Sequence, residues 1–168
     1  MFRLPTHLES LVPPPGDQVP QSQPWRGAFI LPASSPHSSA RPREIFVTAA
    51  ETENDNSQQE QWPAQFHLQI IRRGGILGEV QAWLSQLQPE ELSRCMLMPD
   101  RLPDADLSRQ NKATFESLAR QLLEEGIVAI APWGEPVQPG GILLYPTRTT
   151  RALLVGIVFL NTHFPEFI

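Results

Sequence analysis

Short apolar runs, separated by polar and proline-rich stretches, dominate the chain. Most of these runs are too short for helices and are rich in β-branched and aromatic side chains, which favours strands. In one of them the apolar residues Phe66, Leu68 and Ile70 alternate with polar ones, as expected for a strand with one buried face. The pattern predicts about seven strands, at residues 25–31, 44–49, 66–71, 94–98, 127–131, 142–145 and 152–160.

Two segments instead repeat their apolar residues at helical spacing, which predicts amphipathic helices at residues 76–87 and 108–125. The second helix has Asp106 or Ser108 as its candidate N-cap, and Gly126 stands where a left-handed residue commonly ends a helix. The faces predicted to pack on the strands are Leu77, Val80, Trp83 and Leu84 in the first helix, and Phe115, Leu118, Ala119, Leu122 and Leu123 in the second.

The predicted elements follow one another in the order βββαβαβββ. This order contains few strand–helix–strand units, which disfavours a doubly wound parallel sheet. The last two strands are almost wholly apolar, so they need cover on both faces, from the barrel core and from a helix. We therefore predict an α+β fold, a β-barrel of about seven strands flanked by two to three helices.

Proline-rich and polar stretches set the predicted boundaries. Six prolines precede the first predicted strand, which makes residues 1–23 a stiff, extended leader or linker. Residues 24–161 are predicted to form the barrel domain, followed by a C-terminal extension at residues 162–168. Residues 51–61 contain no apolar side chain and are predicted to be a solvated acidic loop.

Composition and motifs disfavour several classes of function. The 168-residue chain has a net charge of -5, which disfavours direct nucleic-acid binding, and no apolar run is long enough to span a membrane. The four histidines lack His or Cys partners at metal-ligand spacing, and Cys95 has no histidine in its own strand that could activate it. The sequence therefore predicts no catalytic residue, metal, cofactor or small-molecule substrate, and a protein that is not an enzyme.

Arginines remain as the candidates for function. All but one of the 13 basic residues are arginines, whose planar guanidinium suits carboxylates and phosphates better than a lysine point charge. Solubility and local ion pairs are the alternative explanation for their grouping. The three local groups that we predict to bind a partner are Arg41 with Arg43, Arg72 with Arg73, and Arg148 with Arg151.

Several segments carry a resemblance to a known family. They are Trp25-Arg26-Gly27, Gln61-Trp62-Pro63, Phe66-His67-Leu68-Gln69-Ile70-Ile71, Leu143-Leu144-Tyr145 and Leu154-Val155-Gly156-Ile157. In this order they resemble the activator-interaction, or PTOV, domain of Mediator complex subunit 25, a member of the SPOC-like β-barrel superfamily. The resemblance covers about residues 24–160.

The resemblance implies a seven-stranded barrel flanked by helices and a nuclear location. It implies binding to transactivation domains of transcription factors, with other Mediator subunits as further candidate partners. The family's basic turn before the last strand corresponds to Arg148 and Arg151.

Two alternatives stay open. Residues 115–130, an amphipathic helix that leads into Gly126-Ile127-Val128, are also similar to the SPOC domain of transcriptional corepressors. That similarity implies the same barrel, with a basic patch that binds phosphoserine peptides. The other alternative is an enzyme with an unrecognised site. Peptide binding to a catalytically inert barrel would separate the enzyme from the first two readings, and phosphate dependence would separate those two from each other.

Overall fold

The computed structural model describes residues 23–33, 41–51, 57–134 and 138–168. The predicted leader at residues 1–23 therefore lies outside the described residues, except for its last residue. The elements of the described part are β1 (Trp25–Leu31), β2 (Arg43–Glu51), η1 (Gln59–Gln61), β3 (Gln65–His67), β4 (Gln69–Ile71), α2 (Ile76–Gln86), η2 (Pro89–Glu91), β5 (Ser93–Pro99), α3 (Ala105–Glu125), β6 (Val128–Pro132), β7 (Gly141–Pro146) and β8 (Leu154–Phe159).

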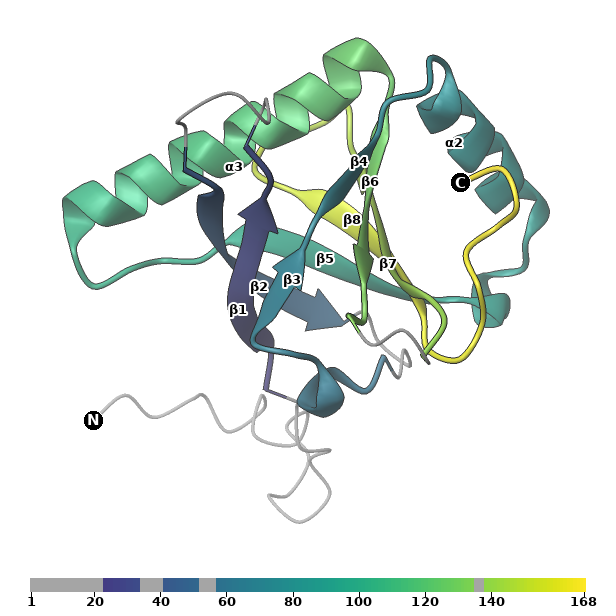
Figure 1. Cartoon of the computed structure of the whole chain (residues 1–168), viewed down its shortest axis with the longest axis horizontal. Helices are drawn as coiled ribbons and strands as arrows, with labels where there is room; N and C mark the ends of the chain where they lie inside the picture. The colour runs from purple at the N-terminus through teal and green to yellow at the C-terminus, as the bar shows by residue number, and fades with distance from the viewer. Residues whose placement is uncertain (1–22, 34–40, 52–56, 135–137) are drawn as a thin grey trace, which may run out of the picture.

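The strands form one curved sheet with the order β3-β1-β2-β5-β8-β7-β6-β4. All neighbours are antiparallel except β1 and β3, which are parallel. The two edge strands, β3 and β4, are consecutive in the chain, so the sheet curls into a nearly closed barrel (Figure 1). This arrangement confirms the predicted α+β barrel with two flanking helices.

The predicted single strand at residues 66–71 is wrong, because the segment divides at Leu68 into β3 and β4. Before this residue the chain pairs with β1, and after it the chain pairs with β6. The Leu68 amide still donates to the Ile30 carbonyl, over 3.0 Å, while its side chain is buried. The alternation of buried and exposed side chains thus continues while the hydrogen-bonding partner changes, and the described part has eight strands rather than seven.

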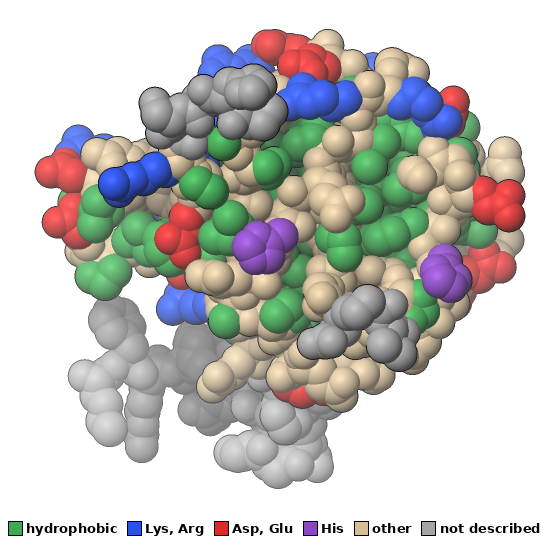
Figure 2. Space-filling view, viewed as in Figure 1, with side chains coloured by type: hydrophobic (Ala, Val, Ile, Leu, Met, Phe, Trp, Pro, Cys, Tyr) green, Lys and Arg blue, Asp and Glu red, His purple; other side chains and the backbone are tan. Residues whose placement is uncertain are grey.

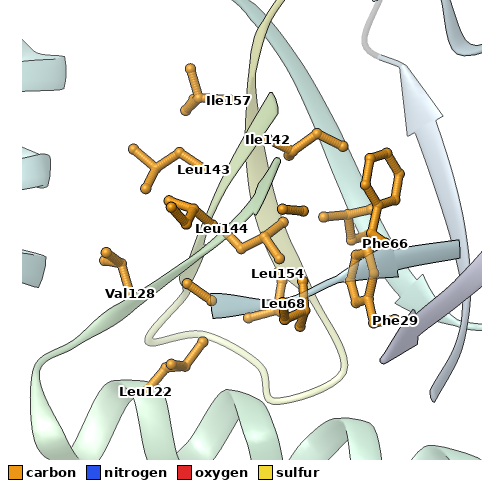
Figure 3. Close-up of a cluster of buried hydrophobic side chains, with 14 of the residues drawn as sticks. Phe29, Phe66, Leu68, Leu122, Val128, Ile142, Leu143, Leu144, Leu154 and Ile157 are labelled. Carbon is orange, nitrogen blue, oxygen red and sulfur yellow. The ribbon is translucent and has the colours of Figure 1, made fainter. Parts of the chain in front are cut away.

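Large apolar side chains fill the barrel. Figure 3 shows a cluster of such side chains. Phe29 comes from β1, Phe66 from β3 and Leu68 from between β3 and β4, while Ile142, Leu144 and Leu154 come from β7 and β8. These positions alternate with outward ones along each strand, as a two-faced sheet requires.

The outer face of β7 and β8 is also covered, as the two apolar runs predicted. Leu143 and Ile157 are paired across the two strands, on the face opposite the barrel interior, yet both are fully buried. α2 covers this face, since Trp83 of α2 stacks on Phe159, which follows Ile157 at the next outward position of β8. The predicted packing of Leu77, Val80, Trp83 and Leu84 is confirmed, and Trp83 packs on the core while staying half-buried.

α3 crosses one end of the barrel and begins earlier than predicted. Its N-cap is Asp104, whose carboxylate accepts hydrogen bonds from the amides of Asp106 and Leu107, so neither predicted cap is correct. The predicted helix end is confirmed, because Gly126 has a left-handed φ of 65°. The predicted packing of Phe115, Leu118, Ala119, Leu122 and Leu123 is confirmed, and Leu123 packs on the core while staying half-buried.

A buried amide ties α3 to the sheet. The Asn111 side chain is 5% exposed; it accepts from the Phe46 amide and donates to the carbonyls of Phe46 and Asp100. It therefore satisfies the backbone of β2 where β5 ends.

Within the described residues, no helix is long and apolar enough to cross a membrane.

The prediction of a wholly solvated loop at residues 51–61 is wrong for its described end. Ser57 and Gln59 are buried although both are polar. The Ser57 carbonyl accepts from the Trp62 indole, and the Gln59 side chain accepts from the Trp25 amide. These polar groups are buried because they satisfy donors at the rim of an aromatic cluster.

Gly27 provides a test of how tightly the barrel closes. A Cβ at this position would meet the Trp25 ring and would stand 2.6 Å from the carbonyl oxygen of Ala64, the residue before β3. We expect Gly27→Ala to lower the free energy of unfolding by about 1–3 kcal/mol, as overpacking does. The measurement is urea denaturation.

The matched control is Gly78→Ala in α2. This glycine is exposed and its Cβ would meet nothing within 4 Å, so we expect stabilisation of about 0.5–1 kcal/mol. A Gly27→Ala protein as stable as the parent would show that β1 does not pack closely against the backbone at Ala64.

Candidate peptide-binding surface

Connections at one end of the barrel carry all six arginines selected from the sequence. The strand registers bring six strand ends side by side at this end of the barrel. In order around the sheet they are the start of β2, the end of β5, the start of β8, the end of β7, the start of β6 and the end of β4. We call this end, which α3 crosses, the α3 end. Figure 2 shows basic side chains along the edge of the molecule where α3 lies, with acidic ones among them. Arg41 and Arg43 lie at the start of β2, Arg72 and Arg73 follow β4, and Arg148 and Arg151 lie between β7 and β8.

The three pairs differ in what they already contact. Arg72 forms an ion pair with Glu125 over 3.4 Å, and Arg73 forms one with Glu79 over 2.6 Å. The other four arginines are exposed and make no ion pair with any residue that the structure describes. A ligand carboxylate could therefore approach these four without first breaking an ion pair.

Threonines order the β7–β8 connection. The Thr147 hydroxyl donates to the Thr150 carbonyl over 3.1 Å, and the Thr150 hydroxyl accepts from the Ala152 amide over 3.1 Å. These bonds tie the connection to its own backbone, and no acidic residue occurs between Pro146 and Leu154. Arg148 and Arg151 thus stand on an ordered turn with no neighbouring carboxylate in the turn.

An apolar row lies on the outer face of the sheet beside this turn. Met96 of β5, Val155 of β8 and Tyr145 of β7 are direct neighbours in the two ladders. Met96 is 43% exposed, and the other two side chains are half-buried. The inward positions of these strands, such as Cys95 and Leu97, are fully buried, so the row is the outward complement of the core.

Arg94 flanks the apolar row and was missed by the sequence analysis. Its Nε is buried and makes no hydrogen bond with the described residues. Its charge acts on Tyr145: burial raises the pKa of the Tyr145 hydroxyl above 10.0, and the Arg94 guanidinium partly opposes that rise. The sequence signal was the alternation in residues 94–98, which places Arg94, Met96 and Met98 on one face of a strand.

A pocket of about 320 Å³ lies at the α3 end, between the end of β5, the first turns of α3 and the β7–β8 connection. Arg109 and Lys112 are paired with Asp106 and Glu116, while Arg101 makes no ion pair within the described ranges. The lining residues are Met98, Pro99, Asp100, Arg101, Ser108, Arg109, Lys112 and Ala152.

A second pocket of about 320 Å³ lies at the opposite end of the barrel and has a different chemistry. Trp62, Trp133 and neutral amide side chains such as Gln61 and Asn161 line it, and it contains none of the predicted arginines. Among the residues that the structure describes, no group of three or more His, Cys, Asp or Glu side chains could hold a metal ion.

Comparisons with known proteins show little similarity in sequence. No family model and no curated protein matches the chain. Among solved structures it is similar to the SPOC domain of human PHD-finger protein 3, at 10% sequence identity and a TM-score of 0.46. The similarity covers 84% of this chain and 98% of that domain. At this TM-score it carries no functional argument, so the candidate site rests on the geometry described above.

Titration of Tyr145 tests the geometry of the row. Tyr145 is the chain's single tyrosine, so tyrosinate absorbance reports this residue alone. We expect a pKa above the ordinary value of 10.0, and a further rise in Arg94→Gln because the opposing charge is lost. The folded state holds the Tyr145 proton more tightly than the unfolded chain does. The stability that comes from this difference is therefore complete below the pKa of tyrosine in the unfolded chain, and it is lost as pH rises through the pKa of Tyr145 in the folded protein.

The control for this titration is Arg120→Gln, which removes an exposed cation from α3. It should leave the Tyr145 curve in place. Equal curves for the parent and Arg94→Gln would contradict the proximity of Arg94 and Tyr145.

Proposed function

We propose that this domain is a protein-interaction module that binds acidic amphipathic segments, in particular transactivation domains of transcription factors. The observation that carries the proposal is the apolar row of Met96, Val155 and Tyr145, bordered by the turn of Arg148 and Arg151. The sequence resemblance to the activator-interaction domain of Mediator subunit 25 supports the same function. A nuclear location and contacts with other Mediator subunits are part of this proposal.

Each part of the surface would have a distinct role in binding. Transactivation segments are disordered when free and fold on their partners, so ordering limits their affinity. The apolar row would take the ligand's aromatic or leucine anchors. Arg94, half-buried beside the row, would add positive charge there, and Arg148 and Arg151 would attract the acidic segment and raise its association rate. A binding surface of this kind requires no catalytic group, and the proposal includes that the protein is not an enzyme.

Charge reversal of the turn tests the proposal. The probe is a fluorescein-labelled peptide with two phenylalanines three residues apart among aspartates. We expect Arg148→Glu/Arg151→Glu to weaken its binding about tenfold at low salt, or about 1.4 kcal/mol. The loss should shrink at high salt because exposed charges are screened beyond about 8–10 Å. The measurement is fluorescence anisotropy, and the melting temperature should hardly change.

The control separates local contact from net charge. Arg120→Glu reverses one exposed cation on α3, as Arg151→Glu does on the turn. Arg151→Glu should weaken binding clearly more than Arg120→Glu. Equal losses would mean that the turn acts only through overall charge, and unchanged affinity at low salt would remove the turn from the binding surface.

Binding of phosphoserine peptides is the second candidate function, and the pocket at the α3 end favours it. Arg101, Arg109 and Lys112 line this pocket together with Asp100. Arg101 makes no ion pair with the described residues, and a doubly charged phosphate could draw Arg109 and Lys112 away from Asp106 and Glu116. If this function is correct, a serine-phosphorylated peptide should bind more tightly than its unphosphorylated counterpart. Arg109→Glu/Lys112→Glu should abolish that difference while leaving binding of the unphosphorylated peptide in place. Equal affinity for both peptides would exclude a phosphate-specific site here.

A further inference from the structure

Aromatic rings form a seam where α2 meets the outer face of β8. The Trp83 ring stacks on Phe159, with 6.2 Å between the ring centroids and 20° between the planes. Leu143 and Ile157 are buried beneath α2 on the same outer face, but Trp83 itself is half-buried. We call the contact of Trp83 with Phe159 the α2 seam. It lies at the border between the covered part of the sheet and solvent.

Residues 161–168 lie on this seam. Phe164 meets Phe159 edge-on with 5.3 Å between the centroids, and Phe167 meets Trp83 edge-on at 5.9 Å. Figure 1 shows the segment running back along the barrel to end beside α2. Phe164, Phe167 and Ile168 all stay half-buried. The segment therefore covers the seam without becoming part of the sealed core.

Arg73 holds the backbone of the segment. Its guanidinium donates to the Phe167 carbonyl and to the Glu79 carboxylate, both over 2.6 Å. Arg73 follows β4 at the α3 end and is one of the six arginines predicted to bind a partner. In this structure the Arg73 guanidinium is hydrogen-bonded to residues 161–168 and to α2 of the same chain.

The segment has the chemistry of the ligand proposed above. Its two aromatic anchors, Phe164 and Phe167, are three residues apart, and the carboxylate of Glu166 between them is exposed. An incoming acidic segment with the same spacing could place one ring on Trp83 and present an oxygen to Arg73. Both occupants would then need the same ring contacts and the same donor.

We propose that the α2 seam is a second docking groove for the aromatic anchors of an acidic amphipathic protein segment, and that residues 161–168 are its built-in occupant. An incoming segment binds there by displacing them. This inference rests on the proposed function, because it assigns a second groove to the same class of partner. The second groove differs from the apolar row in location, because it lies along the edge of α2 and the apolar row lies beside the β7–β8 turn.

The displacement has a thermodynamic consequence. A short segment held mainly by ring contacts opens at lower cost than the strands beneath it. While it is seated, the groove is closed to a partner, and the apparent dissociation constant rises in inverse proportion to the open fraction. A groove that is open about 10–20% of the time would weaken a partner roughly five- to tenfold.

The test compares three full chains with the labelled acidic peptide used above. Phe164→Ala/Phe167→Ala removes both anchors of the segment and should bind the peptide roughly five- to tenfold more tightly than the parent. Thr162→Ala/His163→Ala changes two exposed side chains of the same segment and should bind within about twofold of the parent. Circular dichroism of the parent and the two variants is the check that all three chains are folded.

A second measurement does not depend on the anchor variant being folded. Free peptide of the sequence of residues 161–168 should displace the labelled peptide from the unmodified chain. The same peptide with both phenylalanines replaced by alanine should not. The indole resonance of Trp83, assigned by its loss in Trp83→Phe, should shift when the labelled peptide binds.

The outcomes distinguish the two proposals. Unchanged or weaker binding to the anchor variant, or no displacement by the free segment, would overturn the second groove. If Arg148→Glu/Arg151→Glu still weakens binding in that case, the proposed function stands on the apolar row alone. Absence of peptide binding to any of these chains would overturn both proposals.

Discussion

The backbone of residues 65–71 closes the barrel, and most of the fold depends on this closure. β3 pairs with β1 and β4 pairs with β6, so one short segment supplies both edge strands of the sheet. Leu68 lies at the change of partner, with its amide bonded to Ile30 and its side chain among the core residues. If the closure failed, two strand edges and the interior around Phe29 and Phe66 would meet water. Unpaired edges and exposed aromatic rings are both costly, so the closure and the core support each other.

The helices complete the barrel in different ways. α3 crosses one end, where Leu122 reaches the core and the buried Asn111 amide satisfies the backbone that β2 and β5 leave unpaired. α2 instead covers the outer face of β7 and β8, above Leu143 and Ile157. Because α2 leaves the outer face of β5 and the turn-proximal part of β8 uncovered, Met96 remains exposed there. The candidate surface therefore lies on a part of the sheet that neither helix covers.

The proposed surface combines two physical contributions that neither part supplies alone. Apolar side chains in a row provide burial for anchors but little discrimination between partners. The row is flanked by cations, namely Arg94 on β5 and Arg148 with Arg151 on the turn. These cations favour segments rich in carboxylates. The α2 seam adds an aromatic contact, Trp83 with Phe159, that the chain's own phenylalanines already use. A partner that occupies both surfaces would compete with residues 161–168 at one of them only.

Much of the local structure could be predicted because it follows from local spacing. The alternation at Phe66 and Leu68, the helical repeat in α2, the left-handed Gly126 and the exposure of Arg148 and Arg151 all depend on neighbours within a few residues. The need of the last two strands for cover on both faces was also evident from their composition.

Contacts between distant residues decided the rest. The change of partner at Leu68 leaves the side-chain pattern unchanged, so periodicity could not reveal it. Ser57 and Gln59 are polar and yet buried, because Trp62 and Trp25 bring donors to them from other elements. Arg73 turned out to be engaged by Glu79 and Phe167 rather than free.

The apolar row shows the same division between local pattern and tertiary structure. Alternation around Cys95 could place Arg94 and Met96 on the outer face of their strand, but it could not supply their neighbours. Only the registers of β5, β8 and β7 bring Met96, Val155 and Tyr145 side by side. The sequence by itself thus determined which face of each element is buried and where its turns lie. The tertiary structure alone decided which exposed residues become neighbours, because strand register and helix placement depend on contacts between residues far apart in the chain.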